Sequence, residues 1–323
     1  MSKRKKYYRS PLFYVGDKYK LLKEIKPLFP SEIKRFIEPF TGGGSVFLNI
    51  NASEFLLNDI DYYVYKIHDF LTEQAKNEKL FFETIKQKIY EYGFSRSYLE
   101  DVVPQDLKDK YVKTYFAKFN KVAFQKLKED FNNEQEKDIL KLYLLLIYGF
   151  NRMLRFNSKG KYNLPVGNVD FNQNVVAALN DYFNLVNQKN INFYNLDFVE
   201  FLNIAKPQID DFVYLDPPYL ITFSEYNKLW NEEKEKELVN YLDALNQNNI
   251  KFAISNVTHY KGKINKIFLV WAEKYKIEKV KSNYISYHDN SNKTFEEVLV
   301  MNYIPERKVH KQTKMLFDNE KED

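Results

Sequence analysis

Four consecutive residues, Asp216-Pro217-Pro218-Tyr219, combine three kinds of chemistry at one point of the chain. They follow the apolar segment 211–215, which is typical of a buried strand ended by a turn. The prolines fix their own φ angles and restrict the residue before each, so the local carbonyls point in defined directions. A carboxylate, an oriented carbonyl and a flat aromatic face can together hold the exocyclic amine of an adenine or a cytosine. Such a turn is also a common way to end a strand, so a second signal is needed.

The second signal is the glycine-rich segment Glu38-Pro-Phe-Thr-Gly-Gly-Gly-Ser-Val-Phe47. Residues 34–37 before it are typical of a short strand, and residues 45–50 predict the opening of a helix. Strand, glycine turn and helix form the first unit of a doubly wound α/β domain, where glycines permit a tight turn and let a cofactor approach the backbone. The segment matches neither the dinucleotide fingerprint nor the P-loop, which disfavours NAD and ATP.

A second strand is predicted over residues 55–58, and it is followed directly by Asp59. A carboxylate at the end of the second strand of such a domain can bind ribose hydroxyls. Asp59 and the glycine turn together therefore predict a pocket for an adenosine-type cofactor.

With these motifs in view, the chain resembles the amino-methyltransferases of DNA that use S-adenosylmethionine, and within them the Dam-like adenine methylases. The resemblance extends over nearly the whole chain, in ordered motifs at residues 11–22, 38–47, 58–60, 155–167 and 214–219. It departs from the family pattern at Asp17, which stands where the family has a second glycine. It implies a doubly wound, Rossmann-like methyltransferase sheet with an inserted, mainly helical target-recognition domain.

The chain changes character between the second strand and the Asp216 motif. Amphipathic stretches such as 79–90 and 139–148 replace strand–helix alternation, which indicates an inserted domain. The resemblance makes this insertion the target-recognition domain, whereas the sequence alone equally allows a helical lid. We therefore predict a discontinuous catalytic domain, a recognition domain and a charged tail, at residues 1–65 with 180–305, 66–179, and 306–323 respectively.

The resemblance also implies which residues bind S-adenosylmethionine. Asp197 and Phe198 would flank its adenine ring, although Asp197 is equally suited to cap a helix. Lys18 would meet the methionine carboxylate or form a surface ion pair. The complete implied set is Tyr14, Lys18, Phe40, Gly42, Gly44, Asp59, Asp197, Phe198 and Asp216.

Catalysis is assigned by the same resemblance to Asp216, Pro217 and Tyr219. Adenine N6 is a poor nucleophile because its lone pair is delocalised into the ring. Hydrogen bonds from the amine to the Asp216 carboxylate and the Pro217 carbonyl would return electron density to the nitrogen and stabilise its developing positive charge. The base must leave the duplex to be reached, and Tyr219 would stack on it. The predicted activity is site-specific methylation of adenine N6 in duplex DNA.

Residues 151–167 predict a basic hairpin with its turn at 158–160. Cations there can contact phosphates, polar side chains can contact base edges, and Phe156 can wedge into the base stack. A solvated basic hairpin is the alternative. In the family pattern this segment contacts DNA, which implies DNA-binding roles for Arg152, Arg155, Phe156, Asn157, Lys159 and Lys161.

Composition limits the alternatives. The net charge of +5 and isoelectric point near 8.8 permit a polyanionic partner. The chain has no cysteine, which excludes disulfides, cysteine-based zinc sites and the covalent mechanism of cytosine carbon-5 methylation. Its four histidines are scattered, and we expect no metal. No secretory signal or apolar stretch of membrane-spanning length is found, so we expect a bacterial, cytoplasmic protein that associates with the nucleoid when acting.

Two other functions remain open on the sequence. The same motifs would allow methylation of cytosine N4, RNA adenine or a protein amide. A DNA-binding protein that has lost catalysis is the second alternative. Duplex DNA is the expected partner, the resemblance favours a GATC target, and a restriction endonuclease acting separately is a further partner that the resemblance allows.

Overall fold

The computed structural model describes residues 7–222, 230–280 and 295–306. The chain forms two compact units, which we describe separately. The first contains residues 1–19, 42–49 and 61–189, and the second contains residues 20–41, 50–60 and 190–323. Of the charged tail predicted at 306–323, only Glu306 lies within the described residues. The assignment of catalytic and recognition roles to residue ranges stays a prediction.

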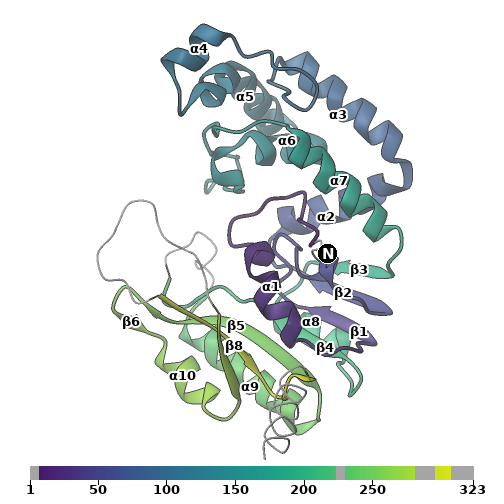
Figure 1. Cartoon of the computed structure of the whole chain (residues 1–323), viewed down its shortest axis with the longest axis vertical. Coiled ribbons are helices and arrows are strands. Elements are labelled where there is room, and N and C mark those ends of the chain that lie inside the picture. Colours follow the sequence, from purple (N-terminus) through teal and green to yellow (C-terminus); the bar gives the residue numbers. More distant parts are fainter. Residues whose placement is uncertain (1–6, 223–229, 281–294, 307–323) are drawn as a thin grey trace, which may run out of the picture. The chain divides into compact units, whose positions relative to one another are not determined.

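The second unit is built on one sheet with the strand order β3-β2-β1-β4-β5-β8-β7 (Figure 1). Strands β1 to β5 pair in parallel where they are neighbours, whereas β8 runs antiparallel to β5 and β7, and β6 pairs with β5. The strands are β1 (Arg35–Glu38), β2 (Glu54–Asn58), β3 (Ile191–Tyr194), β4 (Phe212–Leu215), β5 (Lys251–Tyr260), β6 (Lys263–Ile264), β7 (Lys276–Val280) and β8 (Phe295–Met301).

Strand β4 is buried on both faces, which is why its sequence is apolar without alternation. Val213 and Leu215 belong to the core with helices α8 (Phe198–Ala205), α9 (Glu232–Gln247) and α10 (Lys266–Ala272). The rings of Phe212 and Tyr214 instead pack against Phe29, with centroids 5.0 and 5.1 Å away. Phe29 follows three short helical segments, η1 (Lys18–Leu21), α1 (Leu22–Ile25) and η2 (Lys26–Leu28). This mainly parallel sheet packed by helices confirms the predicted α/β class.

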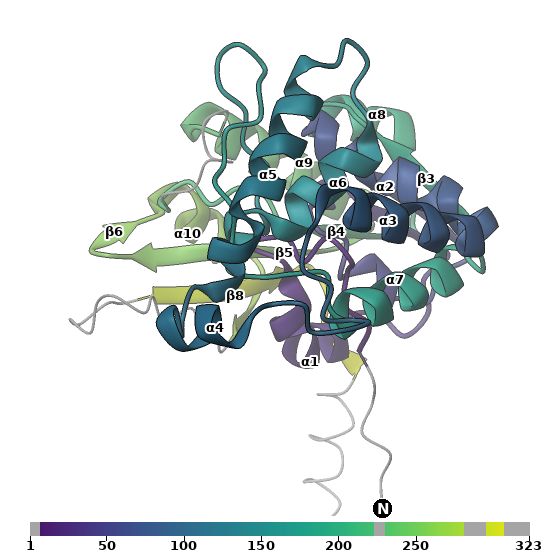
Figure 2. The ribbon, with the colours of Figure 1, turned by 90° about the horizontal axis from the view of Figure 1, so that it is seen from above.

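The first unit is mainly helical. Helix α6 is its centre, because all its residues from Leu142 to Tyr148 are buried, and it packs against α5 and α2 (Figure 2). Several helices begin at a side-chain cap, for example Asp61 on α2 and Asp138 on α6. The elements are η3 (Phe47–Asn49), α2 (Tyr62–Gln74), η4 (Ala75–Asn77), α3 (Glu78–Tyr92), α4 (Gln105–Lys110), α5 (Tyr115–Asn133), α6 (Ile139–Tyr148), η5 (Phe150–Arg152) and α7 (Gln173–Val186).

The prediction that a helix opens over residues 45–50 is wrong, because only the short 3₁₀ segment η3 forms there. Side chains of this stretch bond elsewhere instead. The Asn49 amide accepts from Tyr8 N (2.9 Å) and donates to Tyr8 O (2.7 Å), and Ser45 Oγ donates to Asp17 Oδ2 (2.6 Å). The segment therefore serves as an anchor for the N-terminal residues.

Candidate active site

The Asp216 motif lies at the carboxyl end of β4, as predicted. The Tyr219 hydroxyl is 3.0 Å from Asp216 Oδ1 and 3.0 Å from Oε1 of Glu297, an almost fully buried acid on β8. Burial and the two acids raise the pKa of Tyr219, so its hydroxyl stays a donor across the physiological range. The tyrosine ring is thereby fixed relative to the Asp216 carboxylate.

Asn58 joins the loops that follow three neighbouring strands, and it was not among the predicted site residues. Its Nδ2 donates to Pro39 O and Leu196 O, each at 3.0 Å, and its Oδ1 accepts from Leu196 N at 3.0 Å. The backbone of Thr41 donates to Asn58 O at 2.8 Å. One buried amide thus holds the chain just after β1, β2 and β3. We call these hydrogen bonds of Asn58 the Asn58 clamp. The sequence signal for this role is a polar residue directly after the apolar run 55–57, within the motif 58–60.

Asp197 and Phe198 directly follow Leu196, and they lie at the start of helix α8. Asp197 Oδ1 accepts from Val199 N at 3.0 Å, so the residue is the N-cap, and its Oδ2 pairs with Lys234 Nζ at 3.2 Å. The Phe198 ring lies 5.5 Å from that of Phe40. Both rings also contact Trp230, at 5.7 and 5.6 Å respectively. A cluster of three aromatic rings beside a carboxylate therefore forms at the carboxyl ends of β1 and β3.

The predicted residues of the second unit come together because neighbouring parallel strands end at the same edge of the sheet. Strands β3, β2, β1 and β4 are adjacent, and they are followed by Asp197, Asp59, Phe40 and Asp216 respectively. Asp59 is partly exposed, and Asn195 Nδ2 donates to its backbone carbonyl at 2.8 Å. This edge is where open α/β sheets bind ligands.

The glycine turn belongs to the first unit, and two of its glycines have backbone angles that favour glycine. Gly42 has φ +49° and Gly44 has φ +80°. A Cβ on Gly44 would lie 2.5 Å from a Phe47 ring carbon and 2.8 Å from His68 Cε1, whereas one on Gly42 would meet nothing within 4 Å. Only Gly44 is therefore required by packing as well as by conformation.

His68 holds this turn from behind. Its Nε2 is 2.9 Å from Gly42 O, and its Nδ1 is 3.1 Å from the Tyr182 hydroxyl. Burial lowers the pKa of His68 to about 4, so the ring is neutral at physiological pH. A neutral ring that bonds through both nitrogens donates through one and accepts through the other. No sequence signal points to this role, because the bond from His68 to Gly42 spans 26 residues.

The N-terminal segment packs on the same turn. A Cβ on Gly43 would lie 3.0 Å from Tyr14 Cβ and 3.4 Å from the Asp17 carboxyl group, so the two segments are in close contact. Asp17 accepts from Ser45 Oγ and, at 3.0 Å, from Tyr19 N, and burial raises the pKa of this carboxyl. The departure from the family pattern at Asp17 therefore adds a link to the turn. Tyr14 and Lys18 are both buried.

The predicted basic hairpin is present in the first unit. Phe156 and Tyr162 form a β-bridge, and Asn157 Oδ1 accepts from the backbone N–H of Lys159 (2.9 Å) and Lys161 (3.0 Å). Asn157 therefore closes the turn, while Lys159 and Lys161 are exposed beside it. Arg155 Nε donates to Asn163 Oδ1 at 2.8 Å. Two lysines consequently present the free cationic surface of the turn.

Phe156 and Arg152, two other predicted DNA contacts, pack within the unit. The Phe156 ring stacks on Tyr63 with centroids 4.1 Å apart. The Arg152 guanidinium lies 4.2 Å from the Phe13 ring centroid, and burial lowers its pKa to about 10. Phe150, which is not among the predicted residues, is 48 % exposed and precedes two residues with positive φ, Asn151 (54°) and Arg152 (51°). An exposed aromatic beside a strained backbone is a stronger wedge candidate than a stacked one.

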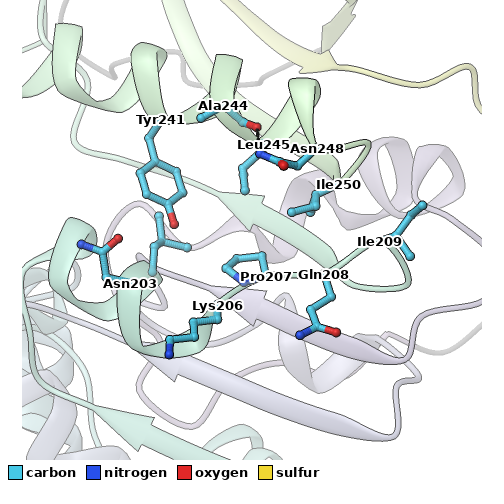
Figure 3. Close-up of a pocket in the computed structure, with 11 residues that line it drawn as sticks. Asn203, Lys206, Pro207, Gln208, Ile209, Tyr241, Ala244, Leu245, Asn248 and Ile250 are labelled. Carbon is cyan, nitrogen blue, oxygen red and sulfur yellow. Dashed lines mark hydrogen bonds between the residues drawn. The ribbon is translucent and has the colours of Figure 1, made fainter.

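Two hollows in the described residues lie away from these groups. The larger, of about 590 Å³, is lined by residues of α3 and α7. The other, of about 510 Å³, lies between the end of α8 and the end of α9, where Lys206, Pro207 and Tyr241 line it (Figure 3). The loops that border it lead into β4 and β5, so it opens at the amino ends of the strands. No predicted site residue lines either hollow.

Residues 14–284 match a family described as D12 class N6 adenine-specific DNA methyltransferase. The chain is 35 % identical over 306 residues to the type II methyltransferase M.FokI of Planomicrobium okeanokoites, covering 92 % of this chain and 43 % of that protein. It is 33 % identical over 314 residues to the modification methylase StsI of Streptococcus sanguinis, covering 94 % and 44 %.

A shorter relative is matched over most of its length. The chain is 28 % identical over 257 residues to the DNA adenine methylase of Escherichia coli K12, covering 77 % of this chain and 80 % of that protein. The chain thus spans less than half the length of the first two relatives and most of the length of the third. Among the helices that the structure describes, none is long and apolar enough to cross a membrane.

Proposed function

The chain belongs to the D12 class of N6 adenine-specific DNA methyltransferases, and from this premise we propose that it methylates N6 of a flipped-out adenine in duplex DNA. The observation that carries the proposal is the Asp216 motif at the carboxyl end of β4, with Tyr219 fixed 3.0 Å from the Asp216 carboxylate. Family membership does not favour cytosine N4, RNA or a protein amide as the target.

S-adenosylmethionine is the proposed methyl donor. The fit rests on the aromatic rings of Phe40 and Phe198, which offer a face to adenine, and on the acids Asp59 and Asp197 at the ends of β2 and β3. Gly42, Gly44, Tyr14 and Lys18 are proposed to contribute from the glycine turn and the N-terminal segment. When bound, the donor supplies an activated methyl group on a sulfonium.

The residues of the chain then position and polarise the target amine. Asp216 and the Pro217 carbonyl accept its two N–H groups, which raises the electron density on nitrogen and stabilises its developing positive charge. The Tyr219 ring stacks on the base, and its hydroxyl, held by Asp216 and Glu297, keeps the ring in place. Asp216 need not be a strong base, because a methylated ammonium loses its proton readily.

DNA contact is proposed for the basic hairpin and its neighbours. Lys159 and Lys161 are exposed and suited to phosphates, and Arg152, Arg155, Phe156 and Asn157 complete the predicted set. We add Phe150 as the candidate wedge, because it is more exposed than Phe156, whose ring is stacked on Tyr63. One of the first two relatives is named a type II methyltransferase and the other a modification methylase, which supports a separately acting restriction endonuclease as a partner.

The deciding experiment is methyl transfer from labelled S-adenosylmethionine to unmethylated genomic DNA, with nucleoside analysis of the product. N6-methyladenine in one short sequence context is the expected result. N4-methylcytosine would overturn the target base, and transfer to RNA alone would overturn the substrate. Asp216→Ala should abolish transfer while DNA binding persists, and equal loss of DNA binding would show that the residue is structural.

A further inference from the structure

Glu235 is a fully buried carboxylate near the start of α9, at a position where an apolar side chain would be expected. It shares the buried face of the helix with Leu238 and Leu242. Removing a carboxylate from water is costly unless hydrogen bonds compensate, and burial raises the pKa of Glu235. A leucine would satisfy packing alone, so the charge calls for a specific reason.

Three N–H groups point at this carboxylate. Trp230 Nε1 donates to Oε2 at 2.6 Å, while Asn265 Nδ2 and Asn256 Nδ2 donate to Oε1 at 2.7 and 3.1 Å. All three donors are neutral. The carboxylate is thus held by hydrogen bonds rather than by an ion pair.

The orientation of both amides is fixed by their other contacts. Asn265 Oδ1 accepts from Phe268 N at 3.1 Å, and Asn256 Oδ1 accepts from Val257 N at 2.7 Å. Each amide therefore has to present its NH₂ group to Glu235. Because every neighbour donates, position 235 requires a group that only accepts, which an ionised carboxylate is and a glutamine amide is not.

The shortest of these bonds holds an aromatic ring. The indole of Trp230 meets Phe40 edge-on at 5.6 Å, with an interplanar angle of 82°, and Phe198 at 5.7 Å. The bond from its Nε1 to Glu235, on helix α9, sets the side-chain torsion angles of Trp230. A change at Glu235 would therefore alter the surface that Trp230 presents beside those two rings.

We propose that Trp230 joins Phe40 and Phe198 as a third aromatic residue of the adenine-binding site, and we call these three residues the aromatic corner. Glu235 is then the positioning residue that orients Trp230. The inference rests on the proposed function, since it takes Phe198 as a residue that flanks the adenine of S-adenosylmethionine and Phe40 as a residue that lines the cofactor pocket. Glu235 itself touches neither cofactor nor substrate and acts through the indole.

The chain offers a matched control in the same helix. Its other tryptophan, Trp271, donates from Nε1 to Asp243 Oδ1 at 2.8 Å and packs against the rings of Phe252 and Tyr275. Glu235→Gln and Asp243→Asn therefore each weaken one indole–carboxylate bond on α9. Only the first should affect the cofactor.

The test is calorimetric titration of the full chain with S-adenosylmethionine. We expect Glu235→Gln to weaken binding about tenfold, the effect of one charge-assisted hydrogen bond, and Asp243→Asn to change it by less than about twofold. Circular dichroism checks that each variant is folded. No heat with the unmutated chain would overturn the proposed function, whereas normal binding unaffected by Glu235→Gln would overturn this inference alone.

A double-mutant cycle separates positioning from a general structural effect. If Glu235 acts through Trp230, Glu235→Gln should add less than about twofold to the loss caused by Trp230→Ala. A further tenfold loss in that background would overturn the proposal. In a Trp271→Phe background, the emission of Trp230 should shift in Glu235→Gln even without cofactor, and an unchanged spectrum would contradict the assigned bond.

Discussion

The glycine turn and the aromatic corner are both held by a buried titratable side chain, but the two solutions are opposite. Behind the turn, His68 is neutral and bonds through both ring nitrogens to Gly42 O and the Tyr182 hydroxyl. At the corner, Glu235 accepts three N–H groups as a carboxylate. Burial lowers the pKa of the histidine and raises that of the glutamate. The comparison shows that the hydrogen-bond partners decide which titratable group can be buried. A carboxylate suits a site where every partner donates, and a neutral imidazole suits a site where one partner donates and the other accepts.

The largest effect on the free energy of unfolding is expected when a methyl group is added at Gly44, next to His68. Gly44→Ala combines a left-handed backbone with a Cβ 2.5 Å from the buried Phe47 ring and 2.8 Å from His68. We expect a loss of about 4 kcal/mol in the free energy of unfolding, from overpacking and backbone strain together. Gly42→Ala, where nothing lies within 4 Å, should cost only about 1 kcal/mol. Equal urea midpoints for the two variants would show that packing against His68 is unimportant.

The next effect is a pH dependence of stability that differs in sign between the two regions. The pKa of His68 falls from 6.5 to about 4 on folding, so the unfolded chain binds more protons between these values and acid destabilises the fold. The shift corresponds to about 3 kcal/mol, of which about 2 kcal/mol should be lost between pH 7 and 5. Glu235 acts oppositely, because its raised pKa makes its contribution less favourable as pH rises above 4.5.

Urea unfolding of His68→Gln and Glu235→Gln at pH 5 and pH 7 checks this comparison. Lowering the pH from 7 to 5 should destabilise the unmutated chain more than it destabilises His68→Gln. The same change should destabilise the unmutated chain less than it destabilises Glu235→Gln. Parallel pH profiles for both variants would refute the opposite assignments.

Asn58→Ala should have a smaller, local effect at the corner. The change leaves Pro39 O and both the N–H and carbonyl of Leu196 without their amide partner. We expect about 2 kcal/mol of destabilisation from these unsatisfied buried groups, together with weaker cofactor binding. Asn58→Asp, which keeps the acceptor but removes the donors, is the matched variant, and full stability in Asn58→Ala would show that water replaces the amide.

The smallest effect is expected for Lys234→Met. Its ammonium pairs with Asp197 at 3.2 Å and with Glu237 at 2.8 Å, but all three side chains are about one third exposed or more. Such an ion pair contributes at most about 0.5 kcal/mol to stability. Thermal unfolding should therefore hardly change, and a large drop would mean that Lys234, not Glu235, is the main support of the corner.

The parts of the site that could be predicted are those whose signals lie within a few consecutive residues of the sequence. The Asp216 motif and Asp59 could be placed because each directly follows an apolar strand, and parallel strands end at one edge of a sheet. The supports could not be placed, since Tyr219 bonds Glu297 across 78 residues and Asn58 bonds Leu196 across 138. Glu235 did carry a signal, because its spacing to Leu238 and Leu242 puts an acid on the apolar face of a helix.

The hairpin shows a second limit of sequence reasoning. Its turn at residues 158–160 followed from local composition, and the structure contains it. Which aromatic residue would be exposed did not follow, because stacking of Phe156 on Tyr63 depends on tertiary packing. The left-handed backbone at Asn151, which precedes Arg152 and follows the exposed Phe150, was equally invisible.

The Asn58 clamp has a consequence for local unfolding. Its backbone carbonyl protects the amide of Thr41, and its side chain protects the amide of Leu196. The two loops therefore cannot fray independently, since breaking the clamp exposes both amides at once. In native-state hydrogen exchange, Thr41 and Leu196 should share one opening free energy despite lying on loops far apart in the chain, and Asn58→Ala should uncouple them.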